Sequence, residues 1–110
     1  MKKYLYLLSS LTILATYTVA QDAVAANIER GGQVFSANCS ACHAGGNNVI
    51  MADKTLKQDA LIANEMNSVE AITNQVTNGK NAMPAFGGRL EASDIEDVAN
   101  YVLSQSENGW

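Results

Sequence analysis

The residues best suited to chemistry lie close together in the first half of the chain. Cys39 and Cys42 are the only two cysteines among the 110 residues, and His43, the only histidine, follows directly. The spacing C-x-x-C-H is the attachment signature of a c-type haem, in which the two thiols add to the haem vinyl groups and the histidine ligates the iron. The sequence therefore predicts one covalently bound haem c.

Three other uses of the cysteine pair are weaker. A disulfide across two intervening residues would close a very small loop and restrict the unfolded chain little. Thioredoxin-like redox chemistry needs a βαβ context that the chain does not offer. A zinc site needs more ligands than one histidine and two cysteines provide.

A haem iron bound by one histidine can take a second axial ligand, and methionine is the best soft donor where no other histidine exists. The candidates beyond residue 25 are Met51, Met66 and Met83. Met51 follows the histidine so closely that the chain would have to wrap the haem edge, and Met66 lies in a helical apolar pattern typical of a core side chain. Met83 lies in an irregular stretch whose course Pro84 restricts. We therefore predict Met83 as the distal ligand; the alternative is that Met83 fills an apolar gap and leaves the iron open.

Residues 1–25 have the pattern of a secretory signal peptide. Lys2 and Lys3 precede an apolar run over residues 4–20, and the small residues at 23–25 form a typical cleavage site. Cleavage after Ala25 would leave residues 26–110 as one mature domain. A retained anchor is the alternative, disfavoured by the Ser and Thr residues within the run. No second run approaches membrane-spanning length, so we expect no membrane insertion of the mature chain.

Composition narrows the classes of function. With 47% hydrophobic and 16% charged residues, the chain is one small domain and not a two-domain enzyme. Residues 26–110 contain five basic and ten acidic residues, which disfavours a nucleic-acid partner. A domain of this size buries little apolar surface by itself, so a haem should supply much of the core.

Helices separated by loops are expected to position these residues, with no convincing strand. Asn27 is a suitable N-cap for a first helix, which ends near the haem motif and before the break at residues 45–48. A second helix is expected over residues 56–66. The predicted inward faces are Ile28, Gly31, Val34 and Phe35 on the first helix, and Leu61, Ile62 and Met66 on the second.

Two further helices flank the stretch that contains Met83. Ser68 is the expected N-cap of the third, which stops at residues 78–79, where glycine can take the left-handed conformation. Ser93 and Glu96 are expected to form a capping box for the fourth. Residues 79–88 between them are predicted to be an irregular loop. The predicted inward faces are Val69, Ile72 and Val76 on the third helix, and Ile95, Val98, Ala99, Val102 and Leu103 on the fourth.

Two segments and one tryptophan resemble a known family. VFSANCSACHAGGNN (34–48), NAMPAFGGRL (81–90) and Trp110 are similar to cytochrome c6 of algae and cyanobacteria, and the resemblance spans residues 26–110. It implies an all-α, class I cytochrome c fold of about four helices around one haem. The related cytochrome c6A carries an additional disulfide, for which this chain has no cysteines.

The resemblance also implies a function and a location. Family members are soluble one-electron carriers of the thylakoid lumen that connect cytochrome f of the cytochrome b6f complex to photosystem I, and some also feed a terminal oxidase. With both axial positions filled, the chain is expected to be a carrier and not an enzyme. A ligand-binding or peroxidatic haem protein would need an open iron site. A periplasmic donor to a respiratory oxidase would use the same ligands with another partner.

Individual residues match the family's positions. Gln75 matches a glutamine near the haem that tunes its potential; its alternative is a solvated helix residue. Arg89 matches a basic residue near the exposed haem edge that members use toward photosystem I; its alternative is an ordinary surface arginine. Four residues match the haem-binding positions: Cys39 and Cys42 (thioethers), His43 (proximal ligand) and Met83 (distal ligand).

Overall fold

The computed structural model describes residues 15–16 and 26–110. This part of the chain folds into five α-helices and one 3₁₀-helix, and its only strand-like feature is an isolated bridge between Lys80 and Met83. The predicted all-α class is confirmed. The signal peptide predicted over residues 1–25 lies outside the described residues, except for Ala15 and Thr16. No helix of the described part is long and apolar enough to cross a membrane.

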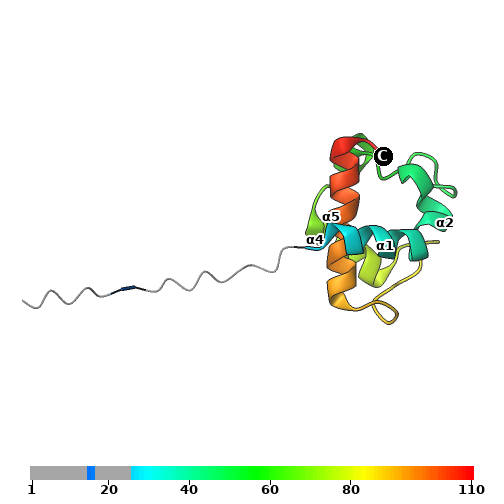
Figure 1. Cartoon of the computed structure of the whole chain (residues 1–110). Coiled ribbons are helices and arrows are strands. Elements are labelled where there is room, and N and C mark those ends of the chain that lie inside the picture. Colours follow the sequence, from blue (N-terminus) through cyan, green and yellow to red (C-terminus); the bar gives the residue numbers. More distant parts are fainter. Residues whose placement is uncertain (1–14, 17–25) are drawn as a thin grey trace, which may run out of the picture.

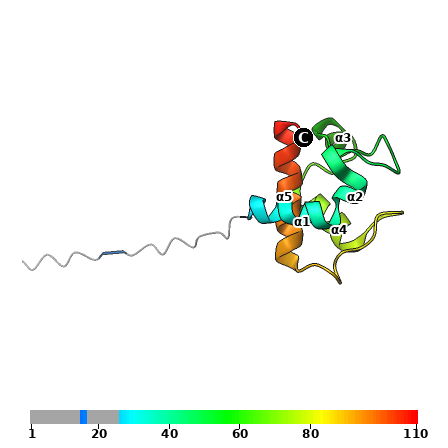
Figure 2. The ribbon, with the colours of Figure 1, turned by 45° about the vertical axis from the view of Figure 1, so that its right-hand side comes forward.

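Helices α1 (Ile28–Asn38) and α5 (Ala92–Asn108) form the main contact of the fold and cross each other in both views of Figures 1 and 2. The predicted cap of α1 is confirmed, because the Asn27 side chain accepts a hydrogen bond from the Arg30 amide at 2.9 Å. Gly31 allows the close approach, since a Cβ atom there would collide with the carbonyl oxygen of Asp97.

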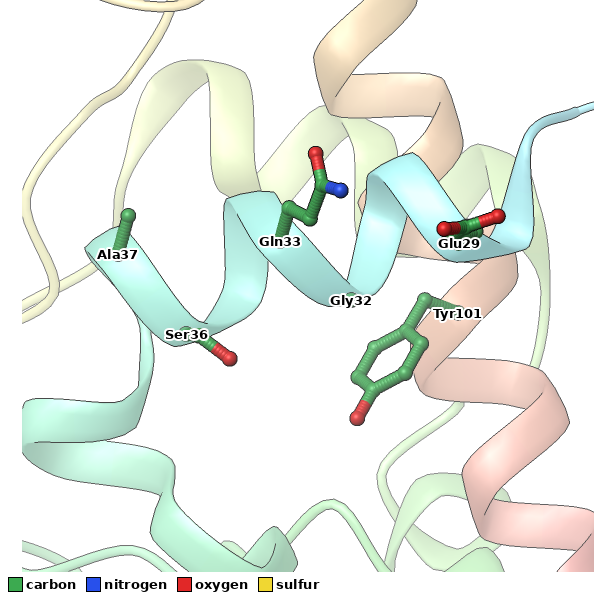
Figure 3. Close-up of a pocket in the computed structure, with 6 residues that line it drawn as sticks. All are labelled: Glu29, Gly32, Gln33, Ser36, Ala37 and Tyr101. Carbon is green, nitrogen blue, oxygen red and sulfur yellow. The ribbon is translucent and has the colours of Figure 1, made fainter.

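The outer side of this crossing carries Tyr101 against α1. A Cβ atom on Gly32 would lie 3.1 Å from Tyr101 Cε2 (Figure 3). The tyrosine ring therefore packs on α1 at a position that has no side chain. Ile28, predicted to face inward, is instead 42% exposed at the first position of the helix.

The core of α5 follows the predicted face. Ile95, Val98, Ala99 and Val102 are buried, and Leu103 packs against them while partly exposed. The predicted capping box is wrong: α5 begins at Ala92, so Ser93 lies within the first turn. Glu91 holds the N-cap position with extended backbone and no side-chain cap, and its carbonyl accepts the first helical hydrogen bond from Ile95.

Helix α4 (Val69–Asn78) agrees with its prediction and packs on α5. Ser68 Oγ accepts a hydrogen bond from the Ala71 amide at 3.1 Å, and the helix ends at Gly79 with a φ of 70°. Ile72 and Val76 form its buried face.

The segment after α1 differs from its prediction. Instead of one helix over residues 56–66, the structure has the six-residue α3 (Gln58–Ala63). Leu56 is outside it because its amide donates to the Gly46 carbonyl at 2.7 Å, and left-handed Glu65 follows its end. Leu61 is buried and Met66 packs against the core, but Ile62, predicted inward, is 58% exposed.

Two short helices that the sequence did not predict carry the cysteine motif. Helix α2 (Ser40–His43) follows α1 after Cys39, and the 3₁₀-helix η1 (Ala44–Gly46) follows at once. The motif is therefore part of a rigid helical connection and not a flexible loop.

Candidate functional site

A cavity of about 670 Å³ opens between α1, α2, α3, α4 and the loop over residues 79–91. Its volume lies within the range of small-molecule and cofactor sites. The candidate haem residues from three separate parts of the chain all line it: Cys39, Cys42, His43, Gln75 and Met83. Its apolar walls are formed by large side chains of the core and its margin: Phe35, Leu56, Leu61, Ile72, Val76, Phe86, Val98 and Val102.

The two cysteines lie at the start of this site. Cys39 joins α1 to α2 and Cys42 lies one turn later, which places residues three apart on the same side of a helix. Both thiols are free and half-buried. Burial raises the pKa of the Cys39 thiol to about 11, so this sulfur is protonated at neutral pH in the haem-free chain. The geometry matches two thiols presented together to one flat cofactor.

The imidazole of His43 is held in one tautomer. Its Nδ1 lies 2.9 Å from the carbonyl oxygen of Asn47, and because a carbonyl only accepts, Nδ1 carries the proton and donates. Nε2 is then left with its lone pair free to bind a metal. Sequence reasoning missed Asn47, since its contribution is a backbone carbonyl that no side-chain motif signals.

Met83 closes a tight turn beyond α4, opposite Lys80. Its amide and carbonyl pair with the carbonyl and amide of Lys80 at 2.9 and 3.1 Å. Gly79 is needed here, because a Cβ atom at its positive φ would lie 2.7 Å from the Met83 carbonyl oxygen. The loop then returns to α4, where Phe86 donates to the Val76 carbonyl. The Met83 side chain is therefore carried on a closed and well-anchored turn.

All three methionines considered above line the cavity, so position alone does not separate them. Gln75 does separate them: its Nε2 lies 3.5 Å from Met83 Sδ and donates to it. This contact orients one sulfur lone pair and leaves the other for a metal. Gln75 is half-buried and faces the cavity from α4, in contrast to the alternative of a solvated helix residue.

The charges of the lining are all of one sign. Lys54, Lys80 and Arg89 line the cavity and no acidic residue does, although acidic residues outnumber basic ones in residues 26–110. A haem carries two carboxylate substituents, so an apolar wall with a basic margin suits it. Together with the sulfur and imidazole donors, the residues present fit a c-type haem.

Arg89 lies at the exposed margin of this cavity. Its guanidinium carbon is 4.8 Å from the centroid of the Phe86 ring, a cation–π geometry that holds the side chain over a buried aromatic residue. The positive charge of Arg89 is therefore held beside the cavity.

A second, shallow depression lies on the outer face of α1 (Figure 3). Its margin includes Glu29, Ser36 and Tyr101, but no sulfur or imidazole. The chemistry suited to a redox cofactor is confined to the first cavity.

Comparisons with known proteins agree with this site. Residues 26–102 match the family model described as "Cytochrome C oxidase, cbb3-type, subunit III". The chain is 79% identical over 85 residues to cytochrome c6 of Bumilleriopsis filiformis, covering 77% of this chain and 99% of that protein. It is 64% identical to cytochrome c6 of Porphyra purpurea over the full length of both.

A solved cytochrome c6 structure has the same fold as this chain. The crystal structure of cytochrome c6 from the diatom Phaeodactylum tricornutum superposes with a TM-score of 0.73 at 53% identity, covering 76% of this chain and 99% of that one. The predicted class I cytochrome c fold is thereby confirmed.

Proposed function

Because this chain belongs to the cytochrome c6 family of electron carriers with a c-type haem, we propose that it carries single electrons from cytochrome f of the cytochrome b6f complex to photosystem I. The observation that carries the proposal is the convergence of both ligand systems on one cavity. His43, oriented by Asn47, and Met83, oriented by Gln75, both line it beside the cysteine pair.

The residues divide the work of holding one haem. Cys39 and Cys42 would form the two thioethers, and His43 Nε2 and Met83 Sδ would be the two ligands of the iron. When bound, the haem supplies one iron that gains and loses a single electron. The neutral thioether of Met83 and the apolar walls favour the ferrous state and so raise the reduction potential.

With His43 and Met83 both bound to the iron, no ligand position would remain for a substrate, which favours a carrier over an enzyme. The bound haem would then exchange its electron at its edge. Fast exchange between two partners favours a small interface, below roughly 1,200 Å² of buried area. Arg89, fixed over Phe86 at the cavity margin, is the residue we assign to orientation toward photosystem I.

The proposed location follows from the proposed processing. Residues 1–25 act as a signal peptide that is removed after Ala25, which leaves residues 26–110 as the cytochrome c domain in the thylakoid lumen. Its partners there are proteins and not nucleic acid.

Absorbance spectroscopy and flash kinetics test this function. The purified protein with its haem should show a low-spin spectrum in both oxidation states, and the reduced protein should re-reduce photosystem I after a flash. A high-spin ferric spectrum would contradict the ligand pair, and a low-spin protein that photosystem I oxidises no faster than an unrelated cytochrome would contradict the partner.

A respiratory role is the second candidate. It is favoured by the family model matched, whose description names a subunit of an oxidase. The same ligands would then deliver electrons to a terminal oxidase, with the periplasm as the location if this is the only role. Oxygen uptake by membranes that contain the oxidase, driven by the reduced protein, would support this role. Flash kinetics would show how fast the same protein delivers electrons to photosystem I.

A further inference from the structure

We propose that Trp110 is a positioning residue for His43, acting through the loop whose Asn47 carbonyl accepts the histidine's hydrogen bond. The inference rests on the proposed role of His43 as an iron ligand. Trp110 lies two residues beyond α5, far from the cysteine motif along the chain, but the fold brings its indole to the base of that loop.

The indole pins one end of the loop by a hydrogen bond. Trp110 Nε1 donates to the Leu56 carbonyl oxygen at 2.9 Å. The Leu56 amide in turn donates to the Gly46 carbonyl at 2.7 Å, which closes the ends of the loop over residues 47–55. Trp110 therefore holds the residue that closes the loop.

The same indole covers the other end of the loop. Gly46 is buried, has a φ of 76°, and lies so close to the Trp110 ring that any Cβ atom there would collide with it. Gly46 directly precedes Asn47, the residue whose carbonyl accepts from His43 Nδ1. The acceptor of the histidine's hydrogen bond is thus the residue next to the one that contacts Trp110.

The loop between these ends is held together by its own hydrogen bonds. The Asn48 side chain accepts from the amides of Ile50 and Met51 and donates to the Lys54 carbonyl, with all three distances at 2.9 to 3.0 Å. The Val49 amide donates to the Cys42 carbonyl at 3.1 Å. Short loops with paired ends and a filled interior are of the Ω type, which often position functional groups.

Trp110 is itself anchored in the core. Its ring centroid lies 5.2 Å from that of Phe35 on α1 and 6.2 Å from that of Tyr101 on α5, and Phe35 is buried. The indole thereby connects the main helix crossing to the base of the loop. The Nδ1–H···O=C bond to Asn47, the first residue of the loop, makes the imidazole a more basic ligand. Weakening of this bond should therefore shift the iron toward the ferrous state.

Substitution of Trp110 by Phe tests the proposal, because it keeps an aromatic ring beside Gly46 while it deletes the Nε1 donor and part of the ring system. In the reduced, haem-containing protein, NMR should show the His43 Nδ1 proton exchanging with solvent about tenfold faster, the change expected from losing one hydrogen bond that closes the loop. The reduction potential should rise slightly. The amides of α5 should exchange as in the parent.

Two further variants sharpen the test. Gly46→Ala should also speed exchange of the Nδ1 proton, because its methyl group displaces the indole. Tyr101→Phe is the matched control: it removes a hydroxyl of the same aromatic cluster, bonded to Gln105 at 3.0 Å, and should change neither the exchange rate nor the potential.

Unchanged Nδ1 exchange in Trp110→Phe would overturn the positioning role, as would acceleration of equal size in Tyr101→Phe. A uniform acceleration that includes the α5 amides would overturn it too, since it would report global loosening. None of these outcomes would contradict the proposed function. The proposed function fails only if the parent protein lacks a low-spin haem or does not reduce photosystem I.

Discussion

At the scale of the residue, the site is defined by groups that orient the ligands as much as by the ligands. The candidate ligands could be proposed from the sequence because C-x-x-C-H and a methionine before proline are local patterns. The orienting groups were not predictable from the residues alone: Asn47 acts through its carbonyl, and the contact of Gln75 with Met83 depends on how α4 meets the following loop. The resemblance to cytochrome c6 suggested a glutamine near the haem, but the contact with the methionine sulfur comes from the structure.

Substitution of Met83 by Ala should open the iron. The loss of the thioether ligand should lower the reduction potential by on the order of 100 mV, a fraction of the ~0.8 V that axial ligands span, and should allow carbon monoxide to bind the ferrous protein. Absorbance spectra and a redox titration measure both effects. Met66→Ala removes another methionine of the same cavity and serves as control; if it lost the low-spin spectrum while Met83→Ala kept it, the assignment would be wrong.

Substitution of Gln75 by Leu should lower the potential more modestly. The Gln75 amide draws electron density from Met83 Sδ, which disfavours ferric iron, so its removal should stabilise the ferric state. The loss of one hydrogen bond of about 1 kcal/mol corresponds to roughly 40 mV for a one-electron couple. Gln75→Glu, if its carboxyl group is ionised, removes the donor and adds a negative charge, so its potential should be lower still; a Leu variant at or above the parent potential would refute the role.

At the scale of the element, the sequence was informative wherever a helix has its own local signals. The caps at Asn27 and Ser68 are confirmed, and so are the apolar faces of α4, α5 and, apart from the exposed Ile28, α1. One error lies where a tertiary contact overrides the local pattern: the Leu56 amide donates to the Gly46 carbonyl, so Leu56 lies outside the second predicted helix. The other is local: the Glu91 carbonyl accepts the first hydrogen bond of α5, from Ile95, so the helix begins before Ser93.

Substitution of Gly31 by Ala tests the helix crossing. The added methyl group would collide with the Asp97 carbonyl, which is backbone and can yield only if α1 and α5 separate. We expect about 2 to 3 kcal/mol of destabilisation, as for other overpacked sites, measured by denaturant unfolding followed by circular dichroism. Gly88→Ala is the control because nothing lies within 4 Å of its added Cβ; equal stability of the two variants would show that the crossing tolerates the methyl group.

At the scale of the whole molecule, the cavity takes space that a small domain would otherwise fill with its own side chains. The buried core described above is short of large residues, and several of its members face the cavity, among them Phe35, Leu61 and Phe86. Without a cofactor, the apolar side chains that line the cavity have no packing partner on that side, and a domain is usually stable by only about 5 to 15 kcal/mol.

Replacement of both Cys39 and Cys42 by Ser should therefore leave a chain that does not fold stably. Without thioethers the haem is not retained, and the apolar cavity either fills with water or collapses. Circular dichroism should show much less helix than in the parent with its haem, and no sharp thermal transition. Full helical content with cooperative melting in the haem-free variant would mean that the protein core suffices alone.

The distribution of charge over the molecule gives the last prediction. Arg89 is one of three basic residues on the cavity, which lacks acidic residues, while residues 26–110 as a whole are acidic. Its position over Phe86 fixes this charge beside the proposed exit of the electron. Arg89→Glu should leave the spectrum nearly unchanged but slow electron donation to photosystem I by about tenfold at low salt.

The deficit should shrink as added salt screens the interaction, because the Debye length falls to about 8 Å at physiological ionic strength. Lys57→Glu is the matched control, since it changes the net charge equally at an exposed residue that does not line the cavity. If Lys57→Glu slowed donation as much as Arg89→Glu, net charge alone would govern the encounter. A slow Arg89 variant beside a fast Lys57 variant would instead locate recognition at the cavity margin, where the haem ligands and the basic side chains meet.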